Sequence, residues 1–326
     1  MQKEGSDLEF PRHFDGKRFY NPDSARVPGF RDVLRWKRTS RAVPSPAFIE
    51  DVEPSLPPRR VEGGELLTTL VNHSTVLLQQ QGCSILTDPI WSERCSPVSF
   101  AGPRRVRRPG QSLDALPDVD ILLVSHNHYD HMDLPTLRKI RKRWTPFVAT
   151  GLGNARHLAK AGIRSAVELD WWQSTELAGA RITYVPSQHF SSRSLYDRNR
   201  CLWGGFVIEA GGAVVYFAGD SGYCPHFAEI GIRFPPIDLS LLPIGAYEPR
   251  WFMSQQHVDP SEAVRAHLDL RSRRSLGMHF GTFQLTDEAI DAPVLTLRQA
   301  RALAGVAESE FDVLAFGETR EFKTAK

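Results

Sequence analysis

Apolar residues from about position 61 onward recur in short runs that predict strands, separated by turns rich in glycine and polar residues. The run 120–125 (DILLVS) is almost continuously apolar, which indicates a strand buried on both faces. The pattern predicts further strands at residues 66–71, 75–78, 84–87, 181–185, 205–209, 213–218, 238–242, 275–279 and 312–316. Several of these strands are close enough along the chain to be linked as hairpins.

Three segments have apolar residues at helical spacing instead. Residues 134–144 combine this spacing with a basic opposite face, and residues 296–304 form a shorter helical pattern. Residues 260–270 follow Asp259, a plausible N-cap, with Glu262 three positions later as in a capping box. Because strands and helices alternate, we expect an α/β fold whose sheets are covered by helices on the outside.

Residues 1–60 differ from the rest of the chain, because they are rich in proline and charge and have only short apolar runs. This composition predicts that residues 1–60 form an irregular N-terminal extension. Aromatic residues such as Phe19, Tyr20 and Trp36 give this extension side chains with which to pack on the main domain, which is predicted to span residues 61–326.

Composition excludes several classes of protein. The 326 residues are 41% apolar and 24% charged, with a formal net charge of +2, which gives no sign of a nucleic-acid-binding domain. No apolar run approaches the roughly 18 residues of a membrane span, and the N-terminus lacks the apolar region of a secretory signal. We therefore expect a cytoplasmic protein, with peripheral contact to a membrane left open. The four cysteines form no CxxC pair, which favours reduced thiols over a disulfide framework.

The segment 125–131 (SHNHYDH) concentrates candidate metal ligands directly after the predicted buried strand. His126 and His128 are two positions apart, so both side chains point the same way in an extended stretch. Asp130 and His131 are adjacent, so a turn can direct them to a second position. Imidazole and carboxylate ligands suit zinc, with manganese and iron as alternatives. Packing alone does not explain four such residues within six positions.

A pair of metals needs more ligands than one loop supplies. His189 follows the strand predicted at 181–185, Asp220 follows the strand at 213–218, and His279 ends the strand at 275–279. Ends of strands are where such loops usually present active-site groups. These three residues are therefore the expected additional ligands.

In this order, the seven residues resemble the metallo-β-lactamase superfamily. Longer blocks resemble one branch of it, the N-acyl-phosphatidylethanolamine-hydrolysing phospholipases D. These blocks are residues 87–92 (TDPIWS), 168–172 (ELDWW), 218–224 (AGDSGYC), 243–253 (PIGAYEPRWFM) and 257–260 (HVDP). At residues 72–75 the chain has Asn-His-Ser-Thr where this family usually has Gly-His-Ala-Thr.

The resemblance implies the αββα sandwich of the superfamily, with two packed sheets flanked by helices. It also implies that one zinc is held by His126, His128 and His189. Asp130, His131 and His279 would hold a second zinc, and Asp220 would bridge the two ions, since a carboxylate has two oxygens. Asp88 resembles the family's acid that accepts the second N–H of a ligand histidine; a simple turn carboxylate is the alternative.

The resemblance further implies a phosphodiester substrate like N-acyl-phosphatidylethanolamine, cleaved to an N-acylethanolamine and phosphatidate. Two zinc ions would activate a water for attack on phosphorus. Asp130, Asp220 and His257 are the expected catalytic side chains, and Tyr129 and His257 match residues that contact the substrate. His257 as a loop anchor and Tyr129 as core packing are the alternatives. The family includes dimers, so a homodimer is an expectation of the same kind.

Rival interpretations remain. A lactonase, or another ester or amide hydrolase, would use the same two-metal site. Nucleic-acid processing is disfavoured by the absence of a basic domain, and a non-catalytic metal-binding protein by the presence of all seven ligands. The basic run 104–108 (RRVRR) would meet anionic headgroups at a bilayer, or simply form a solvated loop.

Overall fold

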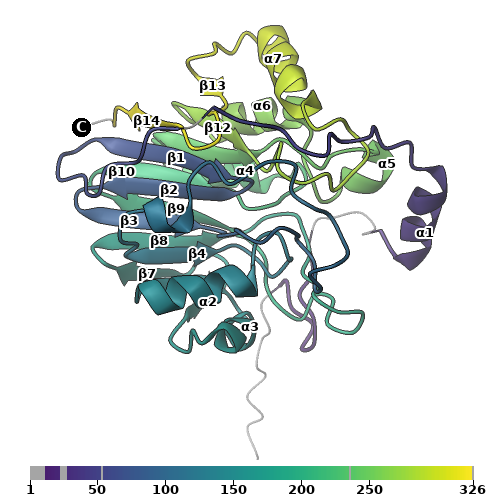
Figure 1. The fold of residues 1–326 in the computed structure, drawn as a ribbon, viewed down its shortest axis with the longest axis horizontal. Coiled ribbons are helices and arrows are strands. Elements are labelled where there is room, and N and C mark those ends of the chain that lie inside the picture. Colours follow the sequence, from purple (N-terminus) through teal and green to yellow (C-terminus); the bar gives the residue numbers. More distant parts are fainter. Residues whose placement is uncertain (1–11, 23–27, 53, 235, 325–326) are drawn as a thin grey trace, which may run out of the picture.

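Strand pairing builds two seven-stranded sheets in the computed structural model, which describes residues 12–22, 28–52, 54–234 and 236–324 (Figure 1). The first sheet has the order β14-β1-β2-β3-β4-β5-β6 and the second the order β13-β12-β11-β10-β9-β8-β7. The strands of the first sheet are β1 (Leu66–Asn72), β2 (Thr75–Gln80), β3 (Cys83–Thr87), β4 (Ile121–Val124), β5 (Phe147–Gly151), β6 (Val167–Leu169) and β14 (Thr319–Phe322). The second sheet contains β7 (Ser174–Leu177), β8 (Ala180–Val185), β9 (Gly205–Ala210), β10 (Ala213–Phe217), β11 (Leu239–Pro243), β12 (Ser275–Met278) and β13 (Phe311–Asp312).

The two sheets are built alike. In the first, β1, β2 and β3 form an antiparallel meander, and β3 to β6 pair in parallel. In the second, β7 to β10 are antiparallel, and β10 to β13 are parallel. Parallel neighbours need crossover connections, and most of these connections contain a helix that lies on an outer face. The connection from β3 to β4 is the exception, because it contains only a 3₁₀ turn.

Helices cover both outer faces, at the top and the bottom of Figure 1. The helices are α1 (Phe30–Thr39), α2 (Leu134–Arg143), α3 (Ala155–Leu158), α4 (His226–Arg233), α5 (Arg250–Met253), α6 (Pro260–Asp269) and α7 (Ala292–Ala304), with 3₁₀ turns at Leu113–Ala115 and Ala159–Ala161. Leu137 and Ile140 of α2 belong to a buried cluster with Leu122 of the first sheet. Helix α6 contacts β11 of the second sheet and both α4 and α7. The αββα sandwich expected from the sequence is therefore confirmed.

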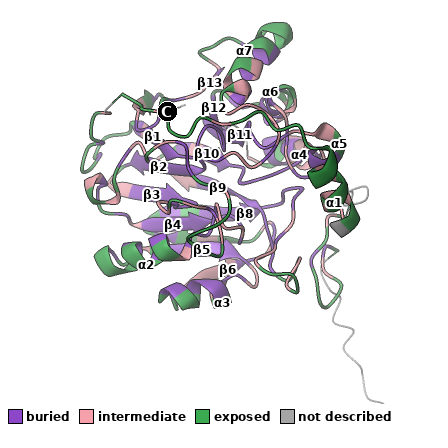
Figure 2. Cartoon of the chain, turned by 45° about the vertical axis from the view of Figure 1, so that its right-hand side comes forward, coloured by how far each residue is buried: buried purple, intermediate pink, exposed green. Residues whose placement is uncertain are grey.

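Strand β4 shows why a continuous apolar run was needed in the first sheet. Ile121 and Leu123 belong to the cluster between the two sheets, whereas Leu122 and Val124 belong to the cluster under α2. All four side chains have no solvent exposure, and Figure 2 shows both sheets buried throughout their centres. Alternate residues of a strand point to opposite faces, so a central strand between two apolar layers is apolar at every position.

Most of the predicted elements lie within a few residues of their predicted bounds, and α6 has the expected capping box. Strands β5, β6 and β7 and helices α3, α4 and α5 were not predicted. The Asp259 side chain accepts the N–H of Glu262, and the Glu262 side chain accepts the N–H of Asp259. The strand predicted at residues 312–316 is wrong beyond Asp312. The chain leaves the second sheet there, turns at Gly317 with a φ of 86°, and then pairs with β1 of the first sheet as β14.

The described part of the predicted extension contains a helix, α1, that the sequence pattern did not predict. Its Trp36 ring lies 5.2 Å from the ring of Phe252 in α5, and its indole N–H donates to Asp287. Residues 1–11, 23–27 and 53 of the extension lie outside the described residues. The division of the chain at residue 60 stays a prediction.

Candidate metal centre

The loop after β4 carries two predicted ligands. A third predicted ligand, from the other sheet, lies within hydrogen-bonding distance of one of them. His126 Nε2 lies 2.9 Å from His128 Nδ1, and His189 Nε2 lies 3.2 Å from the same atom. His189 follows β8, so both sheets contribute. Asp220, which follows β10, places its Oδ2 3.9 Å from His126 Nε2 and 3.7 Å from His189 Nε2. We call His126, His128 and His189 the three-histidine cluster.

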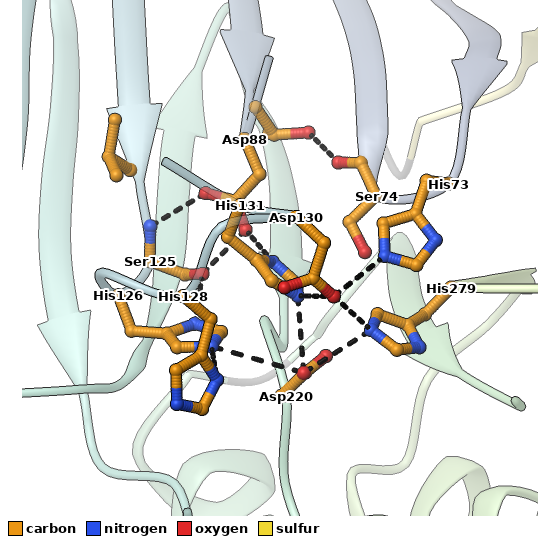
Figure 3. Close-up of polar contacts among 12 residues, drawn as sticks. His73, Ser74, Asp88, Ser125, His126, His128, Asp130, His131, Asp220 and His279 are labelled. Atoms are coloured by element: carbon orange, nitrogen blue, oxygen red, sulfur yellow. Dashed lines mark hydrogen bonds and ion pairs between the residues drawn. The ribbon is translucent and has the colours of Figure 1, made fainter. Parts of the chain in front are cut away.

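A second cluster, which we call the Asp130 cluster, consists of Asp130, His131 and His279. The Nε2 atoms of both histidines lie 3.4 Å from Asp130 Oδ2. Asp220 Oδ2 lies 3.1 Å from His131 Nε2 and 3.3 Å from His279 Nε2. The same carboxylate oxygen therefore lies between the two clusters, as Figure 3 shows.

The backbone around Asp220 explains how its side chain reaches this position. Gly219 has a φ of 60°, and a Cβ there would lie 2.8 Å from both Gly204 O and Ser125 Cβ. Only glycine allows this turn and this approach to the loop after β4. Asp220 is consequently buried, with a side-chain exposure of 2%.

The polar atoms of these clusters fit divalent cations better than they fit one another. One imidazole nitrogen offers a single proton or a single lone pair, so His128 Nδ1 cannot satisfy both neighbouring nitrogens. His131 Nε2 and His279 Nε2 lie near carboxylate oxygens but make no hydrogen bond in the described part of the chain. The ligand atoms within each group lie within 4.8 Å of one another. Such convergence of nitrogen and carboxylate donors is the ligand set of a transition-metal site.

Further contacts fix the orientation of the candidate ligand rings. His131 Nδ1 lies 2.7 Å from Asp88 Oδ2, and His126 Nδ1 lies 2.9 Å from Ser125 Oγ. His189 Nδ1 donates to the Gln256 backbone oxygen at 2.9 Å. Each contact leaves the opposite ring nitrogen directed at the centre. The Asp88 contact is the one implied by the family resemblance.

Burial and charge divide the histidines into two groups. Burial lowers the pKa of His128 to about 3 and that of His189 to about 4, and it lowers the pKa of His126 well below its usual value. These imidazoles are neutral at pH 7, which is the form that binds a metal.

The Asp130 cluster has the opposite balance. Burial disfavours charge there, but the carboxylates of Asp220 and Asp130 raise the pKa of His131 well above its usual value and that of His279 to about 9. The same contacts hold the pKa values of both carboxyl groups well below their usual range, against the effect of burial. A cation bound here would take the place of these two protons.

His73 joins the Asp130 cluster, although no role was predicted for it from the sequence. It lies in the turn between β1 and β2 with a φ of 48°, and its Nε2 lies 3.1 Å from Asp130 Oδ2. Burial lowers its pKa to about 3, so the ring is neutral and donates this N–H. The signal was present in the Asn-His-Ser-Thr block, where the histidine is shared with the usual Gly-His-Ala-Thr of the family.

Replacing His73 by alanine should weaken metal binding about 10- to 100-fold, because Asp130 loses the donor that orients its carboxylate. Competition with a fluorescent zinc chelator measures this affinity. His73→Gln retains a donor and should recover part of the loss. His267→Ala removes another buried histidine, bonded to Ser275 on the far side of the second sheet, and should leave zinc affinity unchanged. Equal affinities for His73→Ala and the wild type would contradict this role.

The two predicted substrate residues lie near the clusters in different ways. His257 Nδ1 lies 3.9 Å from Asp220 Oδ2, and within the described residues this nitrogen has no hydrogen-bond partner. The Tyr129 hydroxyl donates to the Arg193 backbone oxygen at 2.8 Å, and the Arg193 guanidinium lies 4.0 Å from its ring centroid. His257 thus has a free nitrogen at the shared carboxylate, whereas the Tyr129 hydroxyl is held by a neighbouring loop.

The basic run 104–108 does not form one continuous charged surface. Arg105 is buried and donates to the backbone oxygens of Ser92 and Ile90. Arg107 pairs with Asp51. At least two of its four arginines therefore hold the loop in place, so the run is neither one lipid-facing surface nor simply a solvated loop.

The profile of the β-lactamase superfamily domain matches residues 84–280. The N-acyl-phosphatidylethanolamine-hydrolyzing phospholipase D 1 of Caenorhabditis elegans is 37% identical over 307 residues, covering 86% of this chain and 85% of the nematode protein. The chain belongs to the metallo-β-lactamase superfamily, in this phospholipase D family.

Other relatives agree with this membership. The mitochondrial N-acyl-phosphatidylethanolamine-hydrolyzing phospholipase D of Saccharomyces cerevisiae is 35% identical over 64% of this chain, and the match spans 46% of the yeast protein. The isothiocyanate hydrolase of Delia radicum gut bacteria shares the fold, with a TM-score of 0.62, 20% identity, and coverage of 79% of this chain and all of that one. As a member of the family, the chain is a metal-dependent hydrolase. Among the described residues, no helix has the length and apolarity to cross a membrane.

Proposed function

We propose that this protein is a binuclear zinc hydrolase that cleaves the phosphodiester of an N-acyl-phosphatidylethanolamine-like phospholipid, releasing an N-acylethanolamine and phosphatidate. The observation that carries the proposal is the position of Asp220 Oδ2 between two clusters of buried ligand-type side chains. The 37% identity to the nematode phospholipase supports the choice of bond.

In this proposal, the three-histidine cluster holds one zinc, the Asp130 cluster holds the other, and Asp220 contributes to both. Manganese and iron are alternatives, since the ligand atoms are the same. When bound there, two such ions would supply a water of lowered pKa and neutralise charge on the phosphoryl oxygens. The buried carboxylates, and the histidine rings held by Asp88, Ser125 and Gln256, would bind these ions.

His257 is the side chain proposed to meet the substrate at this centre. Burial lowers its pKa well below the usual value, so its imidazole is neutral at pH 7. Its Nδ1 then offers either a proton to a phosphoryl oxygen or a lone pair to a donor of the headgroup. Tyr129 is proposed to contact the substrate from the neighbouring part of the loop.

Peripheral contact with a membrane, a cytoplasmic location and a homodimer remain proposals. The phospholipid class of substrate supports the first of these, because such a lipid resides in a bilayer. A net charge of +2 gives no sign of a nucleic-acid partner, so the positive charge that attracts an anionic substrate must be local.

The direct test is hydrolysis of N-acyl-phosphatidylethanolamine by the full chain with a measured metal content. Mass spectrometry should detect N-acylethanolamine and phosphatidate in equal amounts. A parallel series with bis-p-nitrophenyl phosphate and a panel of lactones identifies the bond that is cleaved. Turnover of lactones without any turnover of phosphodiesters would overturn the proposal in favour of a lactonase.

A further inference from the structure

Two surface loops carry large apolar side chains that are almost fully exposed. Phe100 is 81% exposed on the loop after Cys95, and Leu195 and Tyr196 are 90% and 81% exposed on the loop after His189. Single exposed apolar residues are common on protein surfaces, but several on neighbouring loops mark an interaction site. We call Phe100, Leu195 and Tyr196 the apolar tips.

Both loops border a single groove with a volume of about 410 Å³. Ser96 and Pro97 line it from the first loop, and Ser194 and Asp197 line it from the second. Leu195 and Tyr196 lie between two of these lining residues, so they stand at the rim. Tyr129, which lies between His128 and Asp130 in sequence, lines the same groove. The apolar tips are therefore next to the loop of the candidate metal centre.

The cationic side chains that line this groove are Arg138, Lys160 and Arg193. Arg138 donates to the backbone oxygen of Lys160, and Arg193 donates to the backbone oxygens of Asn127 and Met132. Uncharged carbonyl groups leave both positive charges in place. Among the described residues, no carboxylate lies within 4.0 Å of any of the three cationic groups.

The two carboxylates of the groove are bound by their own loops. Asp133 accepts hydrogen bonds from Ser92 and Thr136. Asp197 accepts the backbone N–H groups of Arg193 and Ser194. Asp133 is buried, and Asp197 is half-buried and keeps one negative charge. The groove therefore combines two exposed cations, Arg138 and Lys160, with an apolar rim, and this combination is complementary to an anionic lipid surface.

We infer that the groove and its apolar tips dock on a bilayer containing anionic phospholipids. The tips enter the boundary between headgroups and acyl chains, while the exposed Arg138 and Lys160 face headgroup phosphates. This docking would present the metal loop, through Tyr129, to a lipid that is still in the membrane. The inference rests on the proposed function for its substrate, but the binding surface is testable without turnover.

Flotation with phosphatidylcholine vesicles, with and without phosphatidylglycerol, measures docking of the full, metal-loaded chain. Phe100→Ser combined with Leu195→Ser should weaken binding to the mixed vesicles by more than about tenfold. The reason is that two large apolar side chains are no longer transferred from water into the bilayer. Arg138→Gln and Lys160→Gln should each weaken it roughly fivefold, and only when phosphatidylglycerol is present. The matched controls are Leu303→Ser, 90% exposed on α7, and Arg298→Gln on the same helix; both should bind as the wild type does.

Several outcomes would overturn the docking surface. They are a wild type that binds neither kind of vesicle, a double variant that binds normally, and controls that weaken binding equally. A dimer that depends on Phe100 and Leu195 in sedimentation would assign the tips to a second copy of the chain instead.

Failure of the proposed function has a different signature. The wild type would then bind mixed vesicles but hydrolyse neither N-acyl-phosphatidylethanolamine nor bis-p-nitrophenyl phosphate. If docking alone is wrong, the double variant hydrolyses lipid in vesicles as fast as the wild type. If both are right, it loses vesicle turnover but keeps its rate on the water-soluble diester.

Discussion

Asp220→Asn should lower kcat/KM for phosphodiester hydrolysis by about a thousandfold or more. Its Oδ2 lies within 3.3 Å of His131 and His279, and it also faces the three-histidine cluster. Asparagine keeps the shape but removes the negative charge that both candidate metal positions share. A loss of about 4 kcal/mol of transition-state stabilisation corresponds to this factor. Initial rates with bis-p-nitrophenyl phosphate measure it.

Asp238→Asn provides the matched control. Asp238, which directly precedes β11, is also buried, at 2% exposure. Its side chain accepts the Val214 N–H and lies near Arg273, not near a histidine. It should keep its metal content and its rate, apart from any loss of folded protein. A wild-type rate in Asp220→Asn with a full complement of metal would remove Asp220 from the centre.

Removing the metals should abolish turnover and lower the melting temperature by roughly 5–15 °C. A ligand present at 100 to 1,000 times its Kd stabilises the folded state by about 2.7–4.1 kcal/mol. The melting temperature of a large domain shifts by roughly 2–4 °C for each kcal/mol of change in the free energy of unfolding. Without cations, the carboxylates of Asp130 and Asp220 are balanced only by protons on His131 and His279. Calorimetry and rate measurements before and after dialysis against a chelator test this expectation.

Restoring single metals separates a specific site from general ionic effects. Zinc or manganese should restore both the melting temperature and the rate, whereas calcium should restore neither, because calcium prefers oxygen ligands over imidazole. Asp220→Asn should show a much smaller metal-dependent shift in melting temperature. Equal melting temperatures and rates in the metal-free and zinc-loaded protein would contradict the expectation.

Strong local patterns allowed much of this fold to be predicted from the sequence. The run at β4 is apolar on both faces, and the capping box at α6 satisfies the helix terminus within four residues. Edge elements were missed for the opposite reason. Strand β7 (STEL) is short and largely polar, so its place in the sheet is decided by pairing with β8. The contact of Gly317 with Gly110, which accompanies the turn towards β14, depends on residues far apart in the chain.

The candidate ligands were predictable because each follows a strand, and parallel strands such as β10 and β12 end at the same edge of their sheet. His73 escaped the same reasoning, since it lies alone in a tight turn between antiparallel strands. Its relation to Asp130 arises only when β1 and β4 are placed in one sheet. The groove beside Tyr129 likewise joins α2, α3 and two loops that no local pattern connects.

Anomalous diffraction at the zinc absorption edge, from crystals of the full chain with zinc, tests the central claim most directly. The account predicts two peaks per chain, one among His126, His128 and His189, and one among Asp130, His131 and His279, with Asp220 between them. A single peak elsewhere, or no peak in well-folded protein saturated with zinc, would contradict it.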